Sequence, residues 1–68
     1  MTWWWKPETG AYEETDLQAA GLLPRFKHKA EAEEWLSLFY EDLQEKGVAE
    51  VSLQEGTRRV YGPMSLDA

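Results

Sequence analysis

Residues 29–47, KAEAEEWLSLFYEDLQEKG, have the pattern of one long amphipathic helix, and the other expected elements are placed relative to it. Acidic side chains crowd its first turn and a lysine lies in its last turn, as the helix dipole favours. Gly47 supplies a left-handed cap, whereas His28 or Lys27, neither a preferred residue, must serve as the N-cap. We expect a helix over residues 29–46 whose apolar stripe, spaced i, i+3, i+4, i+7 and i+11, faces the core: Ala32, Trp35, Leu36, Phe39 and Leu43.

The next stretch, VAEVSLQEGTRRVYGPM (residues 48–64), predicts a β-hairpin with a two-residue turn at Glu55-Gly56. This turn sets Val51 opposite Val60, whereas a slip of one residue would set Val51 opposite an arginine. In this register Ala49, Val51, Leu53 and Val60 face the helix, and the opposite, open face carries Glu50, Ser52, Gln54, Thr57, Arg59 and Tyr61.

Three consecutive tryptophans near the start, in MTWWWKPETG, lie in an aromatic stretch that predicts a strand over residues 2–6, stopped by the proline that follows. Because strand side chains alternate, Trp3 and Trp5 share one face and Trp4 takes the other. Burying two indoles stabilises the fold more than burying one, so we expect Trp3 and Trp5 against the helix and Trp4 on the open face beside Tyr61. The alternative is a second small core over Trp4, formed by side chains that fold under the sheet: Tyr12, Leu17, Leu22, Leu23 and Phe26.

The region between these elements, ETGAYEETDLQAAGLLPRF (residues 8–26), has the weakest pattern. We expect a helical turn from Asp16 to Ala20, closed by Gly21. Tyr12 is a candidate start for a short returning strand.

The element order predicts one α+β domain over residues 1–68. It consists of a small antiparallel or mixed three-stranded sheet with one long helix packed on one face. The order along the chain is strand, short helix or loop, helix, strand, strand. We expect the first strand antiparallel beside the last, giving the spatial order 1-3-2, with a parallel position beside the strand near Val51 as the alternative.

Composition excludes several classes of protein. With 68 residues there is room for one core, which the nine aromatic side chains help to fill. The absence of cysteine removes disulfides, thiolate metal sites and thiol nucleophiles, and favours a reducing compartment. No apolar run approaches the ~20 residues of a membrane span, and no signal-peptide pattern is present, so we expect a cytoplasmic protein. A net charge of −6 makes nucleic acid and anionic membranes poor partners.

No recognisable catalytic or metal-binding motif is present. His28, the single histidine, lies between two lysines, and the spacing offers it neither a nucleophile nor an orienting acid. It has no second histidine at metal-ligand spacing, and the glycines form no phosphate-binding loop. We therefore expect no enzyme activity, no cofactor and no metal.

Both ends of the chain resemble a group of short, uncharacterised proteins of high-GC Gram-positive bacteria. The shared features are the early WWW, a helix containing EAEEWL, and the ending GVAEVSLQEGTRRVYGPMSL, so the resemblance covers most of the chain except residues 7–26. It implies a small intracellular protein and transfers no site. It draws attention to the end of the chain, where Pro63 is expected to stop the hairpin and the tail to fray. Met64 and Leu66 then either plug the core, or belong to a short segment that a partner recognises.

These observations favour a non-enzymatic protein-interaction module. The expected contact surface is an aromatic patch on the open face, with Trp4, Arg59 and Tyr61 as partner-binding residues, because such residues are enriched at interfaces. The partner is a second copy in a homodimer or another, unidentified protein. The alternative is binding of a small ligand or a single-stranded nucleotide on the same aromatic face.

Overall fold

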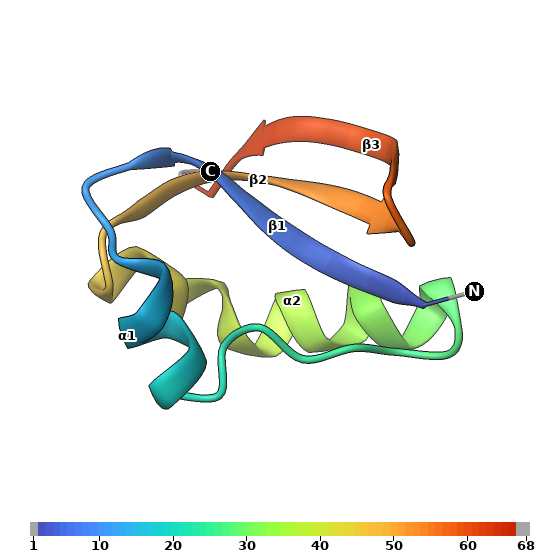
Figure 1. Ribbon diagram of the computed structural model, residues 1–68, viewed down its shortest axis with the longest axis horizontal. Helices are drawn as coiled ribbons and strands as arrows, with labels where there is room; N and C mark the ends of the chain where they lie inside the picture. Colours follow the sequence, from blue (N-terminus) through green and yellow to red (C-terminus); the bar gives the residue numbers. More distant parts are fainter. Residues whose placement is uncertain (1, 67–68) are drawn as a thin grey trace.

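A three-stranded antiparallel sheet forms one layer of the structure, and two helices beneath it form the other (Figure 1). The computed structural model describes residues 2–66. The expected α+β class, with one long helix on one face of a small sheet, is confirmed. In chain order the elements are β1 (Trp3–Gly10), α1 (Glu14–Ala19), α2 (Lys29–Glu45), β2 (Val48–Glu55) and β3 (Arg58–Ser65).

The strand order is β1-β2-β3, and both neighbouring pairs are antiparallel. Both expected positions of the first strand, beside the last strand or parallel to the strand near Val51, are therefore wrong. β2 is the central strand, and its residues from Val51 to Gln54 are buried on both faces. β3 contains Gly62 and Pro63, which suit an edge strand, and the 1-3-2 order would have placed them in the middle of the sheet.

The hairpin turn lies at Gly56-Thr57, one residue later than expected, so the expected register is wrong. A two-residue hairpin turn needs a positive φ at its first central position. Gly56 has φ +61° and supplies it, whereas the expected turn would have required this conformation of Glu55. Register shifts within the β2–β3 pairing then set Leu53 opposite Tyr61.

The shifted register also changes which side chains are buried. Val51 and Leu53 belong to the core, as expected, but Ala49 and Val60 are exposed. On the other face Ser52 and Gln54 are buried, and the Gln54 amide donates a hydrogen bond to the Ser52 hydroxyl (3.1 Å).

β1 continues to Gly10, beyond the expected stop before Pro7. The carbonyl oxygen of Pro7 accepts a hydrogen bond from the Tyr12 hydroxyl (2.9 Å). Because the N and O atoms of one strand residue point to the same side, this bond places the Pro7 nitrogen on the outer edge, away from β2. Its missing N–H therefore removes no bond from the sheet. Tyr12 covers this edge and does not begin a strand.

The expected division of the three tryptophans between the two faces is confirmed. Trp5 is buried and its indole N–H donates to the carbonyl oxygen of Ala32 in α2 (2.7 Å). Trp3 packs against the same core, and Trp4 lies on the opposite side of β1. The side chains considered for a second core over Trp4 join the main core instead: Tyr12, Leu17, Leu22, Leu23 and Phe26.

The helices differ from expectation mainly at their ends and in the rotation of α2. α1 begins at Glu14, before the expected Asp16, and ends at Ala19. α2 ends at Glu45 with Gly47 in the expected left-handed conformation (φ +95°), and His28 occupies the N-cap without a side-chain hydrogen bond. Within the expected stripe, Ala32, Leu36 and Leu43 are buried, whereas Trp35 is half-buried and Phe39 is 37% exposed.

The end of the chain is paired, so the expectation that Pro63 stops the hairpin is wrong. β3 runs through Pro63 to Ser65, and Met64 pairs with Val51. Leu66 is buried, and its N–H donates to the carbonyl oxygen of Ala49 (3.0 Å). The expectation that Met64 and Leu66 plug the core is confirmed. Recognition of this segment by a partner stays a prediction.

Candidate interaction surfaces

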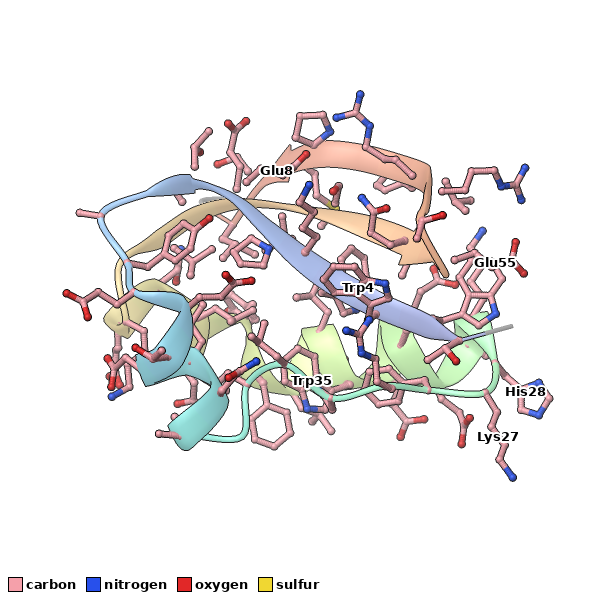
Figure 2. All side chains as sticks on the ribbon, in the orientation of Figure 1. Trp4, Glu8, Lys27, His28, Trp35 and Glu55 are labelled. Carbon is pink, nitrogen blue, oxygen red and sulfur yellow. The ribbon has the colours of Figure 1, made fainter. Side chains whose placement is uncertain are left out.

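Trp4 is the aromatic side chain expected at the centre of an exposed patch, and the structure covers part of it. Its indole N–H donates to the carbonyl oxygen of Gly56 (2.8 Å). The guanidinium carbon of Arg25 lies 4.1 Å from the centre of the Trp4 ring, at cation–π distance. Figure 2 shows Trp4 lying over β1. Both its polar atom and one ring face are therefore engaged within the chain.

Arg59 shares the open face with Trp4, since both pair with Gln54, from opposite sides. The Arg59 guanidinium donates to a carboxylate oxygen of Glu8 (3.2 Å), and the Lys6 amine lies 3.8 Å from the other oxygen. Glu8 thus links β1 to β3 across the open face. This face carries charged pairs rather than the expected apolar patch.

Tyr61 lies on the other side of the sheet. It pairs with Leu53, whose side chain belongs to the core on the helix side. The structure therefore brings Trp4 and Arg59 to one face and Tyr61 to the opposite one. The predicted grouping of the three side chains rested on the hairpin register that the structure corrects.

A groove of about 560 Å³ opens between α2 and β3. It exists because α2 packs against β1 and β2, which leaves the edge strand β3 overhanging the helix. Tyr61 is 58% exposed and Tyr40 is 38% exposed. The apolar lining comes from both layers, with Trp5, Leu36, Tyr40, Leu53, Tyr61, Met64 and Leu66, and the polar rim from Lys29, Glu33, Ser37 and Ser65.

Sequence reasoning missed this groove. Its apolar lining includes Met64 and Leu66, which were expected after the end of the last strand, and Tyr61, which was placed on the open face. The turn at Gly56 alone would set Tyr61 opposite Ser52 on the open face, and the register shift between Leu53 and Gln54 is what brings it to the helix side. The signal that could have suggested an irregular strand is Gly62, because an isolated glycine inside a strand often marks a bulge.

The single histidine and the carboxylates form no catalytic or metal-binding cluster within residues 2–66. His28 is exposed in the N-cap of α2. The described part of the chain contains no group of three or more histidine or carboxylate residues that could hold a metal ion. Between residues 2 and 66, no helix is both long and apolar enough to cross a bilayer.

Comparison with protein-family models, with curated proteins and with solved structures gives no match to this chain.

The hydrogen bond from Trp4 leads to a stability prediction. Trp4→Phe keeps an aromatic ring but removes the donor to Gly56, so we expect the free energy of unfolding to fall by about 1 kcal/mol. Urea denaturation followed by circular dichroism measures this change. The matched control is Trp3→Phe, because the Trp3 indole N–H has no hydrogen-bond partner within residues 2–66. Equal losses in the two variants would show that the Trp4 bond contributes nothing.

Proposed function

We propose that the protein is a non-enzymatic interaction module that self-associates through the groove between α2 and β3. The observation that carries this proposal is the groove itself, with an exposed tyrosine at its margin. Its aromatic and aliphatic lining is the composition enriched at the centres of protein interfaces. This contact surface keeps Tyr61 from the sequence-based hypothesis and replaces the open sheet face with the helix side.

A second copy is favoured as the occupant because the groove is self-complementary. Tyr61 stands beside the groove with more than half of its surface exposed, so across a two-fold axis each Tyr61 can enter the groove of the partner. Lys29 and Glu33 share the rim, and neither forms an ion pair with any residue from 2 to 66. A two-fold axis near them brings each Lys29 to the partner's Glu33, which gives two opposite-charge contacts.

Light scattering or sedimentation equilibrium tests this proposal. We expect the wild type to show twice the monomer mass of 7.9 kDa, and Tyr61→Ala to raise the dimer dissociation constant by about tenfold or more. Leu38→Ala is the matched control, because it truncates another exposed side chain that lies outside the groove lining. Circular dichroism should show the same helix content in all three proteins. A wild type that stays monomeric at millimolar concentration would rule out self-association.

A small apolar ligand is the second candidate, because the groove volume lies within the range of roughly 300–1,000 Å³ typical of ligand sites. Lys29 at the rim suits an acidic head group. Under this alternative the wild type is monomeric, and an aliphatic carboxylate quenches Trp5, which lines the groove. Nucleotide stacking on Trp4 has less support, because Arg25 already lies against its ring.

A further inference from the structure

A second apolar surface lies on the side of α2 that faces away from β3. The rings of Phe26 and Trp35 are 6.0 Å apart between centroids, and those of Trp35 and Phe39 are stacked at 5.2 Å. Leu38 is 68% exposed, the most exposed large apolar side chain among the described residues. Because residues three and four apart are neighbours on a helix, Trp35, Leu38 and Phe39 form one continuous strip. Figure 2 shows Trp35 in the helical layer, below Trp4 on β1, and its ring also packs against the core.

This strip is bordered by carboxylates. Five exposed acidic residues of α2 lie beside it, and none of them forms an ion pair within residues 2–66. The lysines at the two ends of α2 do not neutralise them, because Lys29 lines the groove and Lys46 pairs with Asp16 (3.6 Å). We call this surface the acidic flank: Trp35, Leu38 and Phe39 with Glu31, Glu34, Glu41, Asp42 and Glu45.

We propose that the acidic flank docks a basic amphipathic helix of another protein. The apolar strip supplies area for the partner's apolar face, and the carboxylates around Leu38, on the solvent side of Trp35 and Phe39, attract the partner's lysine and arginine side chains. A helix is the shape that fits, because the i, i+4 rows of α2, such as Glu34–Leu38–Asp42, form ridges into which a second helix packs. This surface is separate from the groove and does not depend on it.

The charge of the acidic flank also decides between possible occupants. A second copy presenting the same surface would bring two sets of unneutralised carboxylates together, which is repulsive. A membrane surface or a nucleic acid would be repelled for the same reason, since both are anionic. A cationic partner with an exposed apolar face can make both apolar contacts with the strip and favourable charge contacts with the carboxylates beside it.

Fluorescence anisotropy with a labelled synthetic helix tests this proposal. The probe has leucines at i, i+3, i+4 and i+7 with lysines on both flanks, and in its counterpart glutamates replace the lysines. We expect the lysine peptide to bind at least tenfold more tightly than the glutamate peptide at about 0.1 M salt, and to bind more weakly at about 1 M salt, where charges are screened. Equal affinity of the two peptides would overturn the proposal.

Variants of the protein then separate a specific site from general attraction to an acidic molecule. Leu38→Ala leaves the charge unchanged and removes the most exposed anchor, so we expect affinity for the lysine peptide to fall about tenfold. Tyr61→Ala, in the groove, should bind the peptide as the wild type does. Unchanged binding by Leu38→Ala, or an equal loss in Tyr61→Ala, would contradict the assignment.

A pair of charge variants tests whether the carboxylates of the acidic flank, and not the overall negative charge, attract the lysine peptide. Glu34→Gln/Glu41→Gln removes two carboxylates beside the strip, whereas Glu13→Gln/Glu14→Gln removes the same charge at the start of α1. We expect a clearly larger loss of affinity in the first variant, and equal losses would overturn the location. Self-association of Leu38→Ala stays at the wild-type level if the groove forms the dimer. Self-association through the groove and peptide binding at the acidic flank can therefore be tested separately, and either can fail without the other.

Discussion

Trp5→Ala should remove a large share of the free energy of unfolding at 25 °C. Trp5 is only 5% exposed, and it contacts both the core and α2, through the bond from its indole N–H to the Ala32 carbonyl oxygen. Replacing a buried tryptophan by alanine costs about 3–5 kcal/mol. A domain of this length has a total stability of roughly 3–10 kcal/mol at typical values per residue. The substitution therefore removes a large share of the stability, or all of it.

Urea denaturation followed by far-UV circular dichroism measures this effect. Trp5→Phe is the matched variant, because it keeps an aromatic ring in the core and removes the N–H donor with part of the ring. We expect it to lose about 1–2 kcal/mol and to remain folded. If Trp5→Ala lost less than 1 kcal/mol, then Trp5 would not join the sheet to α2 as the structure indicates.

Side-chain alternation and helical periodicity were sufficient to predict the elements and much of the core. The alternation of Trp3, Trp4 and Trp5 depends only on an extended backbone, so it held although β1 proved longer than expected. The long helix was equally clear, because its stripe and its Gly47 cap are local features. Local geometry of this kind does not depend on what the rest of the chain does.

Strand order and register depend on contacts between residues far apart in the sequence. Our sequence-based predictions of both were wrong. Matching Val51 to Val60 favoured a turn that lacked a glycine at its first position, and the conformation of Gly56 outweighed that side-chain match. The register shift between Leu53 and Gln54 was not predicted either, and this shift moves Tyr61 to the helix side, where it lines the groove. The orientation of α2 about its axis was also predicted only in part. The helical stripe placed Trp35 on the core face, but the stripe alone does not show that Phe26, from the preceding loop, packs beside Trp35.

The second large effect is expected from glycines at the point where the end of β1 passes the start of β2. Gly10 and Gly47 both have positive φ, +127° and +95°. A Cβ added to Gly10 would collide with the carbonyl oxygen of Gly47, and one added to Gly47 would collide with the carbonyl oxygen of Ala11. The N–H of Ala11 donates to that same Gly47 oxygen (2.9 Å), so the two segments cannot separate without losing a hydrogen bond.

Gly47→Ala should therefore lower the free energy of unfolding by at least about 3 kcal/mol, because it adds a backbone collision to the strain of positive φ. Gly21→Ala is the control within the same protein. Gly21 also has positive φ (+72°), but a Cβ there would meet no atom within 4 Å. Only the conformational penalty of about 1–2 kcal/mol applies to it. Urea denaturation of the two variants measures the difference, and equal losses would mean that the close approach of the Ala11 carbonyl oxygen to Gly47 contributes nothing to the need for glycine there.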